Sequence, residues 1–165
     1  MSNKKEVLVC DCEKLISLLT SKDIYEVIIS LMFCLSKSFY DIAYCKDIEI
    51  NEDGTLKVIY EHQGLFNIIS AKFNSNSWRR VKKFFYEMNK KGVKKKDLFT
   101  MTKSAFDTLE VGFEFKDIPG VSLTYINHVI LKNLDEDVKK IAYRNTFVNS
   151  FTSWDVLNGF TLRLF

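Results

Sequence analysis

A run of apolar residues from Val27 to Leu35, interrupted only by Ser30, places the strongest constraint on how this chain can fold. The run belongs to a predicted helix from about Ile24 to Tyr44, for which Ser21 is a suitable N-cap. The middle of that helix is apolar on nearly every face, so other elements must cover it on several sides. The sequence therefore predicts a central core helix. The run is too short for a membrane span, which needs about 20 apolar residues.

Apolar residues alternate with polar ones from residue 47 onward, which is typical of strands with one buried face. Asn51–Gly54 separates the first two alternating stretches, at 48–50 and 56–60, and is a hairpin signal. A third candidate strand is Leu65–Phe73. We expect these strands to form an antiparallel meander, preceded by a short helix at Leu15–Leu19 and by the core helix.

The C-terminal part of the chain is predicted to return to strands. They are expected at Val111–Lys116 and Val121–Val129, joined through the turn-forming sequence Asp117–Gly120. A short helix at Leu134–Tyr143, with acids in its first turn, and a last hairpin about Asn158-Gly159 complete the prediction.

These elements predict an α+β fold, with N-terminal helices, an antiparallel sheet of hairpins in a meander, and one amphipathic basic helix in the middle of the chain. With 165 residues, one proline and six glycines, the chain can bury a core and shows no linker, so one domain over 1–165 is expected. No apolar stretch typical of a signal peptide follows the charged residues 1–6. We expect an intracellular, cytoplasmic protein, or a nuclear one in a nucleated cell.

The charges of the chain are distributed unevenly. Nine of its 24 lysines and arginines lie between Arg79 and Lys96, where Glu87 is the only acid. This segment carries +8 and the whole chain +3, so the remaining residues sum to −5. A strongly basic element in an otherwise mildly acidic protein indicates a binding site for an acidic partner.

An amphipathic helix is predicted from Trp78 to Lys91, with Gly92 as the C′ residue that closes it. At 100° per residue its apolar side chains gather in an arc of about 120° that would face the core; they are Trp78, Val81, Phe84, Phe85 and Met88. The cations lie on the opposite side, and a loop after Gly92 adds three more. We call the resulting set the basic surface; it consists of Arg79, Arg80, Lys82, Lys83, Tyr86, Lys90, Lys91, Lys94, Lys95 and Lys96.

Several partners fit the basic surface. Clustered lysines and arginines neutralise nucleic-acid phosphates and release counterions, and Tyr86 could stack on a base of a single strand. An acidic protein surface fits the same charges, which makes an inhibitor or immunity-type protein the alternative. A solvated amphipathic helix whose late lysines only complement the helix dipole is a third interpretation. A membrane surface is disfavoured, because the core would claim the apolar face.

A helix from Asp97 to about Leu109 would form a helix-turn-helix with the basic helix. Such a recognition helix needs cationic and base-reading side chains. This one offers few of them: Thr100, Thr102, Lys103, Asp107 and Thr108. We therefore expect nucleic-acid contacts through phosphates rather than through base sequence.

The case for an enzyme rests on Glu114 and Lys116, which would share one face of a predicted strand. With an upstream Asp this is the pattern of metal-dependent nucleases, where carboxylates hold Mg²⁺ and a lysine assists the attacking water. Asp107 is the only near candidate, and seven residues is a short separation for a separate element. A cross-strand charge pair explains the same triplet. His62 and His128 are accompanied by no nucleophile motif.

The four cysteines are expected as reduced thiols in an intracellular protein. Four thiolates could bind zinc, with the first two on one face of an extended segment, but the C-x-C spacing is unusual for a structural knuckle. Buried thiols are the alternative. The residues concerned are Cys10, Cys12, Cys34 and Cys45.

The sequence thus predicts a small non-enzymatic binding or regulatory protein that contacts nucleic acid through residues 79–96. The alternative is an inhibitor of a protein with an acidic surface, and the third interpretation is a metal-dependent nuclease. We assign no catalytic residue, no metal ligand and no cofactor. A sheet edge near the C-terminus could pair with a second copy, which leaves a homodimer open.

Overall fold

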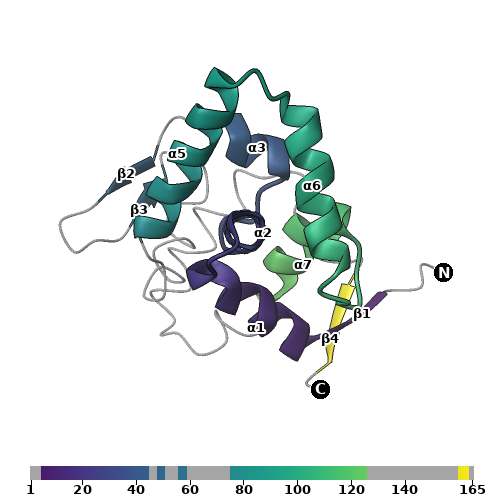
Figure 1. The fold of residues 1–165 in the computed structure, drawn as a ribbon. Helices are drawn as coiled ribbons and strands as arrows, with labels where there is room; N and C mark the ends of the chain where they lie inside the picture. Colours follow the sequence, from purple (N-terminus) through teal and green to yellow (C-terminus); the bar gives the residue numbers. More distant parts are fainter. Residues whose placement is uncertain (1–4, 45–47, 51–55, 59–74, 126–159, 164–165) are drawn as a thin grey trace.

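The computed structural model describes residues 5–44, 48–50, 56–58, 75–125 and 160–163 (Figure 1). The predicted strand at 65–73, helix at 134–143 and turn at 158–159 lie outside the described residues. Six α-helices are described: α1 Val9–Ser17, α2 Ile24–Leu35, α3 Phe39–Tyr44, α5 Ser75–Lys90, α6 Lys95–Asp107 and α7 Ile118–Tyr125. The strands are β1 Lys5–Leu8, β2 Ile48–Ile50, β3 Leu56–Val58 and β4 Phe160–Arg163, and two 3-10 turns are η1 Leu18–Thr20 and η3 Phe115–Asp117.

Helix α2 lies in the middle of the body, with α1, α5, α6 and α7 packed around it (Figure 1). All residues from Val27 to Leu35 are buried. Burying one large aliphatic or aromatic side chain stabilises a fold by about 1.5–3 kcal/mol, so this helix supplies a large share of the core energy. The predicted central core helix is confirmed.

The ends of α2 differ from the prediction. Its N-cap is Asp23, whose Oδ1 accepts a hydrogen bond from the Tyr25 N–H at 2.9 Å, and not Ser21. At the other end Ser36 adopts a left-handed conformation (φ 53°, ψ 45°), so α2 stops and α3 begins as a separate helix. The Ser122 hydroxyl of α7 donates to the Phe33 carbonyl and lies 2.7 Å from the Ser36 hydroxyl. One continuous helix to residue 44 was therefore a wrong prediction.

The predicted α+β fold with an antiparallel meander is also wrong, because the described residues form an all-α body. Their strands make only two short pairs. β2 and β3 pair antiparallel, with Ile48 opposite Val58 and Ile50 opposite Leu56, as the hairpin signal between them predicts. β4 was expected as a strand, but its parallel pairing with β1 was not.

The strands predicted at 111–116 and from 121 are replaced by a loop, η3 and α7. The alternation that suggested a strand is real, since Phe113 and Phe115 are buried while Glu114 and Lys116 are exposed. A loop lying across the core produces the same pattern. Pro119, which we read as part of a turn, lies in the first turn of α7, where a missing N–H removes no helical hydrogen bond.

Helix α1 holds the loop that leads from α6 to η3. The Lys14 ammonium donates to the Leu109 carbonyl at 2.7 Å, and the Gly112 N–H donates to the Asp11 carboxylate at 3.0 Å. Between these contacts Glu110 is left-handed (φ 55°). These contacts fix the position of Phe113 and Phe115 relative to α6.

Candidate functional site

The basic helix is α5, and its apolar arc faces the core as the sequence predicts. Trp78, Val81 and Phe85 are buried, while Phe84 and Met88 are partly buried against the same cluster. The Ser77 hydroxyl, also buried, donates to the carbonyl of Leu19 in η1 at 2.7 Å. This anchoring leaves the opposite side of α5 to solvent.

The end of α5 is a tight helix stop. Gly92 has φ +75°, its N–H donates to the Asn89 carbonyl at 3.1 Å, and the Val93 N–H donates to the Met88 carbonyl at 3.0 Å. This pair of bonds is the Schellman motif, in which glycine takes the left-handed position without a Cβ penalty. The predicted role of Gly92 is confirmed.

Two of the three lysines after Gly92 lie in a helix rather than in the predicted loop, and the third caps it. Lys94 is the N-cap of α6, and Lys95 and Lys96 are its first two residues, so α6 begins two residues before the predicted start. The N-terminal end of a helix carries a partial positive charge from its aligned peptide dipoles. Three lysines therefore stand where a helix favours acids, with Asp97 as the acid in this turn.

All ten residues of the basic surface fall in the described part of the chain. Eight are exposed, and Lys82 and Lys95 are partly buried. Lys83 lies 4.0 Å from Glu87, a weak and exposed ion pair. Lys82 Nζ lies 5.4 Å from the centroid of the Trp78 ring. The charges therefore point outward along α5 and gather round the turn between α5 and α6.

Arg80 differs from the rest of the basic surface. Its guanidinium donates to the carbonyl oxygens of Ser21 and Lys22, at 2.8 and 3.1 Å. These bonds tie α5 to the segment between η1 and α2. The structure thus gives Arg80 a structural contact that the sequence did not indicate, although Arg80 and its neighbour Arg79 are both exposed.

Tyr86 lies within the cationic stripe of α5. Its ring is 61% exposed, and Lys90 Nζ lies 4.9 Å from the ring centroid. Because Arg79, Lys83, Tyr86 and Lys90 follow one another at spacings of three or four residues, they share one side of the helix. An aromatic face and cations thus occupy the same strip of surface.

A second group of exposed rings escaped the sequence analysis. Tyr40 and Tyr44 of α3 are 40% and 61% exposed, and their rings stack at 6.3 Å. Tyr40 also stacks on Phe99 of α6 at 5.4 Å, with 7° between the ring planes. Lys95 Nζ lies 4.8 Å from the Tyr44 centroid. The only sequence signal was two tyrosines four residues apart, a weak one without knowledge that α6 begins beside them.

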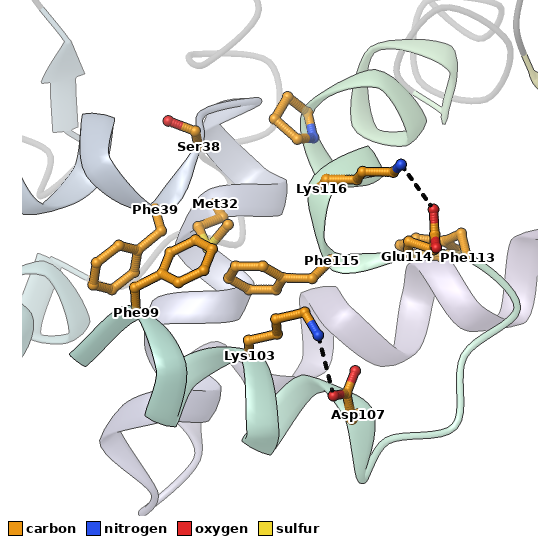
Figure 2. A pocket seen from close by; sticks show the side chains of 11 residues that line it. Met32, Ser38, Phe39, Phe99, Lys103, Asp107, Phe113, Glu114, Phe115 and Lys116 are labelled. Carbon is orange, nitrogen blue, oxygen red and sulfur yellow. Dashed lines mark ion pairs between the residues drawn. The ribbon is translucent and has the colours of Figure 1, made fainter. Parts of the chain in front are cut away.

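A pocket of about 460 Å³ opens between α2, α3, α6 and η3 (Figure 2). The nuclease residues Asp107, Glu114 and Lys116 all line it. However, Glu114 precedes a 3-10 turn rather than lying on a strand, and it pairs with Lys116 at 3.4 Å, while Asp107 pairs with Lys103 at 3.7 Å. The predicted strand geometry of the triplet is therefore wrong. Among the residues that the structure describes, no three His, Cys, Asp or Glu are grouped so that they could hold a metal ion.

The cysteines are placed differently from the sequence expectation. Cys10 and Cys12 lie in α1 instead of an extended segment. Side chains two positions apart in a helix point about 200° apart around its axis, so Cys10 is exposed and Cys12 is buried. Cys34 is buried in α2, and Cys45 lies outside the described residues. Burial, aided at Cys12 by the charge of Asp11, raises the pKa of Cys12 and of Cys34 to about 12.

Within the residues that the structure describes, no helix has the length and apolarity needed to cross a membrane. Comparison with protein-family models, with curated proteins and with solved structures finds no match to this chain.

Proposed function

We propose that this protein binds nucleic acid through the basic surface, mainly by contacts to phosphates. The observation that carries the proposal is the position of Lys94, Lys95 and Lys96 at the positive end of α6. A cation in the first turn of a helix is unfavourable by about 0.3–1 kcal/mol at low ionic strength. A bound phosphate would offset this cost, because it adds negative charge where both the lysines and the helix dipole favour it.

This position separates two explanations of the lysines. Lys90 and Lys91 end α5, where cations complement the dipole, so helix stability alone can account for them. The same explanation fails for the lysines that open α6, since the sign of the dipole is reversed there. An anionic partner accounts for both groups.

The exposed rings favour a single strand over a duplex. Tyr86 and Tyr44 are each 61% exposed, with a lysine ammonium within 5 Å of the ring centroid. Bases of a single strand can stack on such rings, whereas bases within a duplex are already stacked on each other. Lysine contacts to phosphates give affinity with little dependence on base sequence.

Helix α6 supports contacts to phosphates rather than to base edges. Leu98, Thr102 and Phe106 are buried against the core, and the Thr102 hydroxyl donates to the Leu98 carbonyl at 2.7 Å. The face of α6 that packs on the body therefore cannot enter the groove of a nucleic-acid duplex. Its exposed residues include Thr100 and Ser104, which are uncharged, and Lys103, which pairs with Asp107 at 3.7 Å, so α6 offers few groups that could read base edges.

The test is the affinity for a fluorescent single-stranded oligonucleotide, measured by anisotropy at low salt. Changing Arg79, Lys83, Lys90 and Lys94 to Glu should weaken binding by at least about 100-fold, because four phosphate contacts become repulsions. The matched control replaces Arg79 with Lys and replaces Lys83, Lys90 and Lys94 with Arg. Because every charge is kept, it should bind within a few-fold of the wild type. Equal binding by the charge-reversed and the control variants would contradict the proposal.

A pull-down from native lysate, with and without nuclease, distinguishes the alternative partner. Nucleic-acid binding predicts that captured material disappears after nuclease treatment. Capture of one acidic protein that survives nuclease treatment, with no oligonucleotide binding, would instead support an inhibitor of that protein.

A further inference from the structure

The pocket between α6 and η3 has a floor of aromatic rings. Figure 2 shows Phe39, Phe99 and Phe115 side by side, with Met32 behind them. The Phe99 ring lies 5.6 Å from that of Phe39 and 5.4 Å from that of Phe115, with 77° between the ring planes in both pairs. Its volume of about 460 Å³ lies in the range of small-molecule sites, about 300–1,000 Å³. The floor is therefore apolar and aromatic, with its rings packed edge to face.

The rim of the pocket carries charges of both signs. Lys103 pairs with Asp107 at 3.7 Å, and Lys116 pairs with Glu114 at 3.4 Å (Figure 2). Each of these four side chains is more than half exposed. Exposed pairs contribute little to stability and open easily. The rim therefore offers both hydrogen-bond donors and acceptors to a ligand, with a net charge of zero.

These two properties specify the kind of ligand. A group with apolar faces and with both donors and acceptors on its edge fits this lining. Nucleobases have this character, since their faces stack on aromatic rings and their edges present amino groups, carbonyls and ring nitrogens.

A continuous strip joins the pocket to the basic surface. Lys95, Phe99, Lys103 and Asp107 follow one another at intervals of four residues, so they lie along one side of α6. Lys95 and Phe99 are about 6 Å apart along the helix axis. Lys95 lies against the ring of Tyr44, which stacks on Tyr40, and Tyr40 stacks on Phe99. Cations and rings thus lead from the start of α6 to the floor of the pocket.

We propose that this pocket receives one unstacked base of a single strand whose phosphates lie on the basic surface. The inference rests on the function proposed above and adds to it the form of the nucleic acid. A base enters such a pocket only when it is unpaired, or after it has been flipped out of a duplex, which costs unpairing and unstacking energy. The pocket therefore adds to the preference for single strands that Tyr86 already favours, while the cations of the basic surface bind the phosphates of either form.

The experiment compares a 15-nucleotide single strand that contains one 2-aminopurine with the duplex of the same sequence. The wild type should bind the single strand at least tenfold more tightly, and the 2-aminopurine fluorescence should change when a base stacks in the pocket. Phe99→Leu keeps an apolar side chain but removes the ring, and should reduce the preference for the single strand three- to tenfold. Met101→Leu, an exposed position elsewhere on α6, is the matched control and should behave as the wild type.

A second variant keeps the test informative if Phe99→Leu folds poorly. Lys103→Met removes an exposed rim donor and should weaken single-strand binding threefold or more with duplex affinity unchanged, whereas Lys103→Arg should bind as the wild type. If the wild type binds both forms equally and the Arg79, Lys83, Lys90 and Lys94 charge reversal still abolishes binding, the proposal of a base in the pocket is contradicted and the proposed function stands. Unchanged 2-aminopurine fluorescence on binding would also overturn the pocket. Absence of binding to both forms would overturn both proposals.

Discussion

The guanidinium of Arg80 donates a hydrogen bond to the backbone carbonyl of Ser21 at 2.8 Å, across 59 positions of sequence. A second bond to the Lys22 carbonyl completes a fork that joins α5 to the start of the central helix. Arg79, one residue earlier, is exposed and has no such contact among the described residues. Two adjacent arginines of the basic surface thus have different roles, one in holding α5 and one in presenting charge.

This difference predicts opposite effects for two matched variants. Arg80→Ala should lower the free energy of unfolding by about 1 kcal/mol, because it removes two hydrogen bonds from a charged donor at an exposed site. Arg79→Ala should leave stability within about 0.5 kcal/mol of the wild type and weaken oligonucleotide binding more than Arg80→Ala does. Urea denaturation and anisotropy check the two effects. The same stability loss at both positions would contradict the distinction.

The lysines that open α6 predict a conflict between stability and binding. Lys96→Glu should raise stability by about 0.3–1 kcal/mol, because an acid suits the first turn of a helix, and should weaken oligonucleotide binding. Lys91→Glu is the matched control, since it follows the last residue of α5, where an acid is unfavourable, and it should lower both quantities. Melting temperatures should shift by about 1–4 °C in opposite directions. Shifts of the same sign would show that the helix dipole has no part in the effect.

The cysteines should differ in reactivity. Cys10 is exposed in α1, whereas Cys12 and Cys34 are buried and their pKa is raised to about 12. Because the thiolate is the reactive form, iodoacetamide at pH 8 should label Cys10 within minutes in the native protein. Labelling of Cys12 and Cys34 should require denaturant. Peptide mapping by mass spectrometry separates the sites, and rapid native labelling of Cys34 would contradict the packing of α2.

The same thiols predict a loss of stability at high pH. Below pH 9 the thiols are protonated in both the folded and the unfolded chain, so they cause no pH dependence. Above the ordinary pKa of 9.0 the unfolded chain loses these protons first, which stabilises the unfolded state until the folded pKa of about 12 is reached. Each buried thiol should lower stability by about 1.4 kcal/mol per pH unit in this window.

Cys34→Ala provides the control for this effect. It should be less stable than the wild type at neutral pH because it leaves a cavity, yet its stability should fall less steeply above pH 9. Denaturation curves at pH 8, 9.5 and 10.5 give the slopes. Parallel slopes for the two proteins would exclude Cys34 as a source of the loss.

The apolar pattern of the sequence was sufficient to predict elements that bury one face, and also an element that is buried on all sides over a long run. The apolar arc of α5, the Gly92 stop and the buried run of α2 all follow from such patterns. Two errors have a common cause, since short apolar runs do not distinguish a strand from a buried helix or a loop. Except for Ser122, residues 121–125 are apolar, aromatic or β-branched, and each of their described side chains is buried, which suits α7 as well as a strand. Phe113 and Phe115 alternate inward although they lie in a loop and in η3 rather than in a strand.

The candidate site could be predicted only in part, because its second half depends on tertiary contacts. The cations of α5 follow from local spacing. In contrast, the stacking of Tyr40 on Phe99 joins residues 59 positions apart, and no local pattern specifies it. The contact of Arg80 with Ser21 has the same origin. The break of the predicted long helix at Ser36 also depends on a distant residue, Ser122 of α7.

The salt dependence of single-strand binding tests the central claim most directly. If six to eight phosphates contact the basic surface, a plot of log Kobs against log salt concentration should have a slope of roughly −4 to −6. The Arg79, Lys83, Lys90 and Lys94 charge-reversed variant should show no measurable binding from which to take a slope. A slope near zero, or no binding by the wild type at low salt, would contradict phosphate binding by residues 79–96.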